Sequence, residues 1–318
     1  MSIQFTGTCT TYPAQSTSTT IAFDGVNMWA AGNSVVMKID PSGSSKQYSI
    51  GEGNTIVGIA FDGINMWTCN YASTSSVSKI SPTGTVTTYY NLGIYAPHSI
   101  AFDGMNMRVT LYNGNQVVKV DPLGNSTLYP VDSGASPYGI AFDGTNMWIA
   151  NFNLNTVSKI APNGTYTSYG PTGANPVGIA FDGTNMWTSN LGSGGVGSVT
   201  KITPTGTCTT YTGIGAGALN IAFDGYYMWT CNSIDNTVSR INPRRSRINP
   251  RNEVILTFSV TGNSPEPSGI AFDGMNMWTA NGGNDSVSEI ATGNTLGDST
   301  ELEEWLENRF DQPIWTEL

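Results

Sequence analysis

The sequence is poor in charge and has no long apolar run. Charged residues make up 11% of its 318 residues, less than half of the share typical of soluble proteins. The net charge of −10 argues against broad electrostatic binding to nucleic acid. No apolar stretch approaches the roughly 18 residues that span a bilayer, and the first residues lack the basic and apolar segments of a secretory signal. We therefore expect neither nucleic acid nor a membrane as a partner.

Histidine and cysteine are also scarce. Cys9 and Cys208 recur in one phrase, Gly-Thr-Cys-Thr-Thr-Tyr, and Cys69 and Cys231 recur in another, Trp-Thr-Cys-Asn. Because equivalent positions of different repeats lie far apart, we interpret all four as free thiols that pack as small apolar side chains, with disulfides as the alternative. His98 is the only histidine, so no second imidazole can assist it. We expect no metal site and no cofactor.

What the sequence has in abundance is one phrase, Ile-Ala-Phe-Asp-Gly-X-Asn-Met-Trp, in seven near-copies. Its aspartates are Asp24, Asp62, Asp103, Asp143, Asp182, Asp224 and Asp273. A period of about forty residues, built from short apolar runs and turn residues, is typical of a β-propeller with one four-stranded blade per repeat. We predict an all-β fold, a seven-bladed β-propeller of four-stranded antiparallel blades over residues 1–293. An acidic amphipathic C-terminal docking tail follows over residues 294–318.

The fourth repeat shows the strands of one blade and the seventh shows how the ring closes. In the fourth repeat, Asp-Gly and Pro-Asn-Gly turns separate four predicted strands, at residues 139–142, 147–151, 156–160 and 165–169. The seventh repeat lacks a fourth strand, whereas residues 7–12 duplicate the fourth strand of the fifth repeat at 206–211. We predict that residues 5–12 pair with the third strand of the last repeat, near 286–291, and leave no open sheet edge.

These phrases resemble the class of seven-bladed propellers that includes NHL and YVTN repeats, the YncE-like proteins and virginiamycin B lyase. The resemblance rests on Gly-Ile-Ala-Phe-Asp-Gly-Thr-Asn-Met-Trp-Ile-Ala-Asn and Asn-Thr-Val-Ser-Lys-Ile, and it extends over about nine tenths of the chain. The class contains enzymes as well as binding and scaffolding modules, so the resemblance implies a fold rather than a function. It also implies that lyase-like members use a histidine base and a carboxylate-bound magnesium ion. Here only His98 could be that base, and the alternative is an incidental loop residue.

The candidate binding residues lie on one face of the predicted ring. Antiparallel strands place the Asp-Gly turns on one face, the Asp-Gly face, and the loops between second and third strands and between blades on the other, the variable-loop face. Near the variable-loop face the sequence places Tyr71, His98, Tyr112, Tyr138 and Phe152. We predict that any small ligand binds there. The Met-Trp pairs are interpreted as core between blades, and the alternative, aromatic rings that hold sugars, makes glycans a candidate ligand.

Arg108 departs from the repeat because it replaces the tryptophan of the third phrase. An arginine in a packed slot between blades must find acceptors or reach water. We interpret it as locally paired or at an exposed edge, with binding of an anion or another ligand as the alternative. The seven aspartates are interpreted as turn caps rather than metal ligands, since each belongs to an Asp-Gly turn and no calcium-loop spacing occurs.

A tandem heptapeptide duplication, Ser-Arg-Ile-Asn-Pro-Arg-Arg followed by Ser-Arg-Ile-Asn-Pro-Arg-Asn, occupies residues 239–252. We place it in the connection between the third and fourth strands of the sixth blade. It contributes five arginines: Arg240, Arg244, Arg245, Arg247 and Arg251. A duplication in a tolerant loop and a loop that binds an anion or a partner are both consistent with this pattern.

The tail has seven acidic residues and one basic residue. Thr300 and Glu303 form a capping box, and Pro313 should end the helix that it starts. The apolar side chains that follow the capping box are Leu302, Trp305, Leu306 and Phe310, with Trp315 beyond the proline. Their spacing predicts one apolar stripe on a short helix. Such a helix is expected to dock, on its own propeller or, as we prefer, on another protein.

These observations favour a non-enzymatic binding or scaffolding propeller. Sparse charge and the tail suit a structural or adhesion component of a virion, an appendage or a cell surface. The expected location is therefore outside the cell or on a particle without a classical signal peptide, with the cytoplasm as the alternative. The alternative function is a virginiamycin B lyase-like enzyme with an axial pocket on the variable-loop face.

Overall fold

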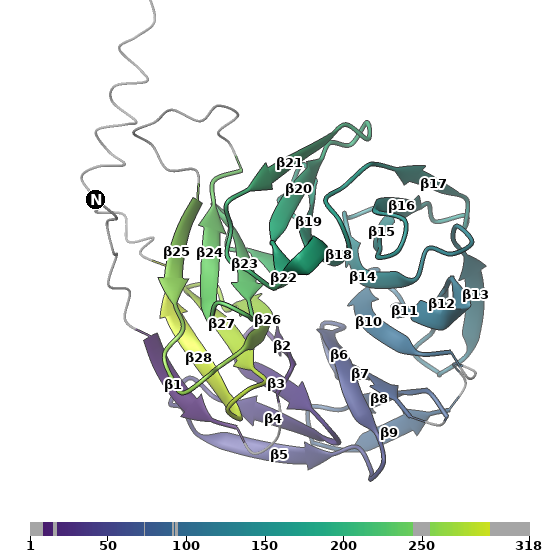
Figure 1. Ribbon diagram of the computed structural model, residues 1–318. Helices are drawn as coiled ribbons and strands as arrows, with labels where there is room; N and C mark the ends of the chain where they lie inside the picture. The colour runs from purple at the N-terminus through teal and green to yellow at the C-terminus, as the bar shows by residue number, and fades with distance from the viewer. Residues whose placement is uncertain are drawn as a thin grey trace, which may run out of the picture.

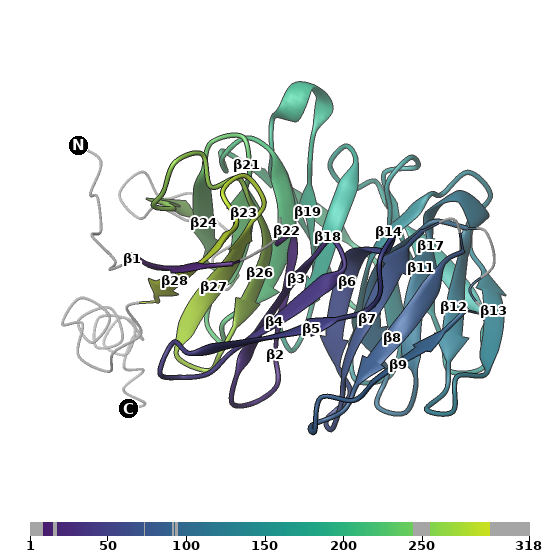
Figure 2. The same ribbon diagram turned by 90° about the horizontal axis from the view of Figure 1, so that it is seen from below.

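The computed structural model describes residues 9–292, apart from 15–17, 73, 91, 93–94 and 244–254. Within these residues, seven four-stranded antiparallel sheets stand as blades around a central axis (Figure 1). Each blade presents the first strand of its repeat to the axis, and its strands run between the two faces of the ring (Figure 2). The predicted all-β, seven-bladed propeller is thereby confirmed.

The first four blades follow the repeats in order. Blade 1 contains β2 (Thr20–Phe23), β3 (Met28–Gly32), β4 (Val35–Ile39) and β5 (Ser45–Ser49). Blade 2 contains β6 (Thr55–Phe61), β7 (Met66–Tyr71), β8 (Ser76–Ile80) and β9 (Val86–Tyr89). Blade 3 contains β10 (Pro97–Phe102), β11 (Met107–Leu111), the 3-10 turn η1 (Tyr112–Gly114), β12 (Gln116–Val120) and β13 (Ser126–Pro130). Blade 4 contains β14 (Pro137–Phe142), β15 (Met147–Asn151), β16 (Thr156–Ile160) and β17 (Tyr166–Tyr169).

The last three blades complete the ring. Blade 5 contains β18 (Pro176–Phe181), β19 (Met186–Asn190), η2 (Ser193–Gly195), β20 (Ser198–Ile202) and β21 (Cys208–Thr212). Blade 6 contains β22 (Ala218–Phe223), β23 (Met228–Asn232), β24 (Thr237–Ile241) and β25 (Ile255–Ser259). Blade 7 contains β26 (Pro267–Phe272), β27 (Asn276–Asn281), β28 (Ser286–Ala291) and the N-terminal strand β1 (Cys9–Pro13).

The N-terminal strand closes the ring as predicted. β1 pairs antiparallel with β28, and the register runs from Cys9 opposite Ile290 to Pro13 opposite Ser286. This confirms the predicted pairing for residues 9–12, while residues 5–8 lie outside the described part of the chain. A strand from one terminus thus covers the edge that the other terminus leaves open.

Each Asp-Gly turn is held by its aspartate, as the turn-cap interpretation predicts. In blade 4, Oδ1 of Asp143 accepts the backbone N–H groups of Thr145 at 2.8 Å and Asn146 at 2.6 Å. Oδ2 accepts the indole N–H of Trp148 at 2.7 Å, a contact that the sequence analysis missed. Burial acts to raise the pKa of Asp143, but the hydrogen bonds from Asn146, Trp148 and Thr145 outweigh it and lower the pKa.

We expect Asp143→Ala to lower the free energy of unfolding by about 2 kcal/mol, because it leaves a buried indole N–H and a turn without their acceptor. Trp148 is 2% exposed, and its indole N–H has Asp143 as its acceptor. Asp143→Asn retains one oxygen for the turn amides and should lose less. Urea unfolding of the two variants measures both effects. An Asp143→Ala protein as stable as the wild type would contradict the role of this carboxylate.

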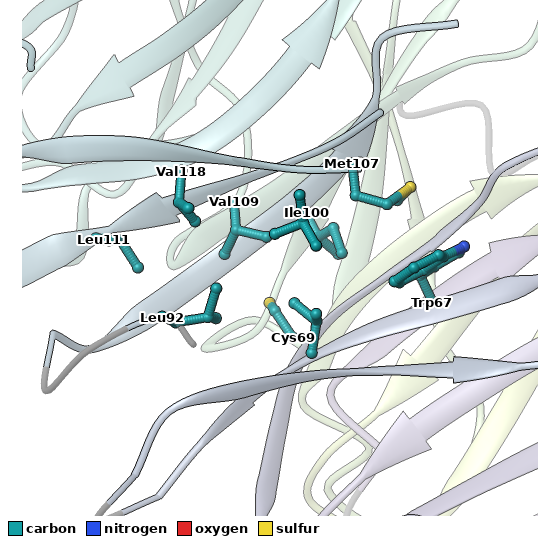
Figure 3. Packing of buried hydrophobic residues seen from close by; sticks show 10 residues of the cluster. Trp67, Cys69, Leu92, Ile100, Met107, Val109, Leu111 and Val118 are labelled. Atoms are coloured by element: carbon teal, nitrogen blue, oxygen red, sulfur yellow. The ribbon is translucent and has the colours of Figure 1, made fainter. Parts of the chain in front are cut away.

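The core consists of seven apolar clusters, each between neighbouring blades. In the cluster of Figure 3, Trp67 and Cys69 of blade 2 pack with Ile100, Met107 and Val109 of blade 3. All four cysteines are free; Cys69 and Cys231 are buried, whereas the other two are half-buried. Burial raises the pKa of the Cys69 and Cys231 thiols far above its usual value. The free-thiol interpretation is confirmed, and full burial holds for two of the four.

Helices contribute little to the part of the fold that the structure describes. η1 and η2 span three residues each. Among the residues that the structure describes, no helix has the length and apolar character needed to cross a bilayer.

Candidate functional site

The first strands of the blades surround a cavity of about 400 Å³ on the propeller axis. Two successive positions of each first strand, just before the Ile-Ala-Phe segment, supply most of its wall. The outer of these positions is occupied around the ring by Thr19, Val57, His98, Tyr138, Val177, Leu219 and Ser268. Because first strands run from the variable-loop face toward the Asp-Gly turns, the cavity lies toward the variable-loop face.

Local irregularities in the first strands bring these side chains to the axis. Pairing of β10 with β11 shifts register between Pro97 and Ile100, and pairing of β14 with β15 shifts between Pro137 and Ile140. β6, β18, β22 and β26 have comparable shifts. A bulge of this kind re-aims side chains, and the residues inside it line the cavity. His98 was expected in the loop before the strand; it lies instead within β10 because the strand continues through the bulge.

Hydrogen bonds tie the bulges of neighbouring blades together. Thr110 Oγ1 accepts the backbone N–H of Ser99 at 3.0 Å and donates to the carbonyl oxygen of Tyr138 at 2.6 Å. Ser189 Oγ similarly accepts the N–H of Gly178 at 3.0 Å and donates to the carbonyl oxygen of Leu219 at 3.1 Å. The cavity wall is therefore fixed by side chains of second strands.

Four of the six predicted binding residues form one aromatic cluster beside the cavity. The rings of His98 and Tyr138 are stacked at a tilt, with centroids 3.5 Å apart. Phe152 stacks on Tyr138 at 5.6 Å. Tyr112 lies 5.8 Å from His98, 6.1 Å from Tyr138 and 6.3 Å from Phe152. Residues from blades 3 and 4 thus build a single half-buried aromatic surface.

The cavity is electrically neutral at neutral pH. Burial lowers the pKa of His98 to about 4, although a backbone hydrogen bond opposes the shift. Burial, with a smaller contribution from Tyr112, raises the pKa of Tyr138 to about 12. None of the described residues that line the cavity is an aspartate, glutamate, lysine or arginine. Hydroxyl and amide groups of Thr19, Asn220 and Ser268 supply its polar character.

The other two predicted binding residues lie elsewhere. Tyr71 ends β7 with a 52% exposed side chain. Arg108 is on the Asp-Gly side of blade 3, where its Nε donates to Oδ2 of Asp103 at 2.6 Å and its guanidinium lies 5.0 Å from the ring centroid of Tyr129. In the other blades the indole of tryptophan makes the corresponding bond to aspartate and stacks on the corresponding aromatic ring, as Trp148 does on Tyr169 at 5.6 Å. The structure thereby confirms local pairing of Arg108.

Arg240 lies in β24 rather than in the connection where the duplication placed it. Its guanidinium stacks at 4.3 Å on Tyr227 and 5.8 Å on Trp229, and its Nη1 donates to the carbonyl oxygen of Thr292 at 3.1 Å. Strand register explains this position, because residue 240 is where the third strands of blades 1, 2, 4 and 5 hold a lysine over tryptophan, as Lys159 lies over Trp148. The remaining predicted interaction residues lie outside the described part of the chain: Arg244, Arg245, Arg247, Arg251, Leu302, Trp305, Leu306, Phe310 and Trp315.

Several solved structures share the fold of this chain. No family model matches the chain, and no curated protein sequence matches it. Among solved structures, virginiamycin B lyase from Staphylococcus aureus superposes with a TM-score of 0.76 at 21% identity, covering 90% of this chain and 99% of the lyase. A streptogramin B lyase gives 0.75 at 20% identity, covering 89% and 97%. Kuenenia stuttgartiensis hydrazine synthase gives 0.72 at 16% identity, covering 92% and 98%.

The likeness establishes the propeller fold. At these identities it does not carry an activity to the chain, and the similar structures differ among themselves in what their names describe. The resemblance to virginiamycin B lyase-like propellers that the repeats indicate is confirmed at the level of structure.

Thr110, Asn220 and Ser268 also shape the cavity, although they are not among the residues predicted from the sequence. Serine, threonine and asparagine fill most polar positions of this chain, so their type carries no signal. The positions of Asn220 and Ser268 do carry a signal, because the residues just before each Ile-Ala-Phe differ from repeat to repeat while the phrase itself is repeated. Within the described residues, no three histidine, cysteine, aspartate or glutamate side chains gather where they could hold a metal ion.

Proposed function

We propose that this protein is a non-enzymatic binding propeller that holds a small uncharged ligand, of the glycan class, in its axial cavity. The observation that carries this proposal is the aromatic surface of His98, Tyr138, Phe152 and Tyr112 beside a neutral, hydroxyl-bearing cavity. An aromatic ring buries the apolar face of a sugar while polar groups around it bond the sugar hydroxyls. A volume of about 400 Å³ is within the range of small-molecule sites.

The chemistry of His98 supports binding over catalysis. Acid–base catalysis near pH 7 works best when the pKa of the catalytic group lies near that pH. The pKa of His98 is about 4, so its imidazole is a weak base and remains uncharged. Its ring is also stacked on Tyr138. We therefore assign His98 to the ligand-binding surface.

A second candidate function is a lyase-like activity at the same cavity. The observation that favours it is the placement of the single histidine at the axis of a propeller that resembles lyases with TM-scores of 0.76 and 0.75. Streptogramin B turnover that is present in the wild type and lost in His98→Ala would support this candidate. Unchanged binding of the glycan ligand by His98→Ala would not bear on it.

We expect Tyr138→Ala to weaken binding of a glycan selected on an array by about fivefold or more, because stacking of this kind contributes on the order of 1 kcal/mol or more. Tyr71→Ala is the matched control, since Tyr71 is exposed and has no ring contact with the cluster among the described residues. Isothermal titration calorimetry of the three proteins measures the effect. Equal affinities for wild type and Tyr138→Ala would place the ligand outside the axial cavity.

The scaffolding part of the function rests on the tail. We propose that residues 294–318 attach the propeller to another protein, and that the location is a virion, an appendage or a cell surface. The apolar stripe beside seven acidic residues supports this proposal. The segment follows β28, whose end lies on the Asp-Gly face, so the partner would contact the face opposite the cavity mouth.

A further inference from the structure

A groove between blades 3 and 4 on the Asp-Gly face differs from its equivalent between blades 4 and 5. The first has a volume of about 460 Å³ and is bordered by Asp103 and Arg108. The second has a volume of about 150 Å³ and is bordered by Asp143 and Trp148. Arg108 and Trp148 occupy the same position of the repeat. The groove between blades 1 and 2, where Trp29 stands at this position, has a volume of about 440 Å³. The groove between blades 3 and 4 is therefore distinguished by its arginine rather than by its volume.

Positive charge exceeds negative charge in the larger groove. Arg108 and Lys119 face each other across β11 and β12, and Asp103 is the one carboxylate among the described residues of the groove wall. Asp103 is already engaged, since Oδ1 accepts the N–H groups of Met105 at 2.9 Å and Asn106 at 2.6 Å and Oδ2 accepts Nε of Arg108 at 2.6 Å. A bound anion would therefore lie near two cations and one carboxylate whose oxygens already accept hydrogen bonds.

Several donors of the groove remain available. Within the described residues, the Nη1 and Nη2 groups of Arg108 have no hydrogen-bond acceptor and neither has Nζ of Lys119. The equivalent Lys79 instead donates to the carbonyl oxygen of Pro122 at 3.2 Å. The ring of Tyr129 lies against the guanidinium of Arg108 at 5.0 Å and Asp103 holds its Nε. Two contacts thus fix the guanidinium plane before any ligand arrives.

We propose that this groove binds an oxyanion, the phosphate or sulfate ester group of a small ligand, between Arg108 and Lys119. A guanidinium presents two parallel donors to two oxygens of such a group, and an ammonium adds a point charge. Tyr129 and Thr145, whose side chains carry hydroxyl groups, also border the groove. The site lies on the face opposite the mouth of the axial cavity, so it stands apart from the proposed glycan site.

Titration with glucose 6-phosphate and glucose 6-sulfate at constant ionic strength tests the proposal. Arg108→Trp is the informative variant, because tryptophan stands at this position in the other six repeats and the fold accommodates it. We expect saturable binding of at least one ester by the wild type, weakened by about tenfold or more in Arg108→Trp and in Lys119→Met. Lys159→Met, at the same position of blade 4, is the control and should bind like the wild type.

The two esters identify the source of the oxyanion. Preference for the phosphate ester indicates a phosphorylated ligand, and preference for the sulfate ester indicates a sulfated glycan. Sulfate and phosphate salts also stabilise proteins by exclusion from their surface, so a raised melting temperature does not count as binding. The proposal is overturned if calorimetric titration of the wild type with millimolar ester shows no saturable binding, or if Arg108→Trp binds as tightly as the wild type.

Discussion

A chain that begins at residue 14 is expected to lose the closed ring and most of its stability. Removal of β1 strips the backbone partners from β28 along five register pairs and exposes a sheet edge. It also removes Tyr12, whose ring stacks on Trp278 at 5.3 Å and whose hydroxyl donates to Glu289 Oε2 at 3.0 Å. Open edges pair with other chains, so aggregation should accompany a loss above about 4 kcal/mol.

Size-exclusion chromatography and urea unfolding measure this outcome. A chain that begins at residue 9 is the matched control, since it retains β1 and should behave like the wild type. A synthetic peptide of residues 7–14, added during refolding, should restore part of the lost stability by filling the same edge. If the chain from residue 14 is monomeric and unfolds at the wild-type urea midpoint, the N-terminal strand does not close this ring.

Acidification from pH 7 to pH 4.5 is expected to destabilise the wild type through His98. Its pKa is about 4 in the folded protein against an ordinary value of 6.5. The unfolded chain therefore binds a proton between these values while the folded protein does not. The contribution of His98 to the free energy of unfolding is fully present above about pH 6.5. Below that pH it falls by about 1.4 kcal/mol per pH unit, and the total loss reaches about 3 kcal/mol by pH 4.

His98→Val isolates this effect, because valine occupies the equivalent ring position at Val57 and Val177. The variant should show little loss between pH 6.5 and pH 4.5, as measured by urea unfolding at each pH. Asp143 and the other turn aspartates with a lowered pKa, such as Asp24, act in a separate window. Their stabilisation is present above about pH 4 and is lost below it. Equal acid sensitivity of wild type and His98→Val would show that His98 is not buried as a neutral group.

Much of the fold follows from the sequence because each repeat encodes a blade locally. Predicted strands at 147–151 and 156–160 coincide with β15 and β16. The first strand begins at Pro137, two residues earlier than predicted, and the fourth begins at Tyr166, one residue later. These differences arise where a bulge extends the strand and where a tight turn shortens it. Both depend on packing against the neighbouring blade, which a single repeat does not encode.

The sequence predicts several residues of the candidate site but not how their side chains are arranged. Tyr112, Tyr138 and Phe152 were assigned to one face with His98, but ring contacts between blades 3 and 4 depend on how the blades are rotated about the axis. Tyr71 shares that face and still lies outside the cluster. The partners of Arg108 also depend on strand register. Tyr129 lies near Arg108 because β12 pairs both with β11, which holds Arg108, and with β13, which holds Tyr129.

The pairing of Cys9 with Ile290 sets an order of events during synthesis of the chain. β1 is synthesised before the other strands of the ring, and its partner β28 is synthesised after them. At about 5–20 residues per second, β1 waits for tens of seconds while six blades form beside it, and contacts between distant segments are slow to form. During this interval an unpaired β1 can enter the open edge of another copy. Strand-exchanged dimers are therefore a specific risk where many copies are made close together, and a lower concentration of incomplete chains should favour the closed monomer.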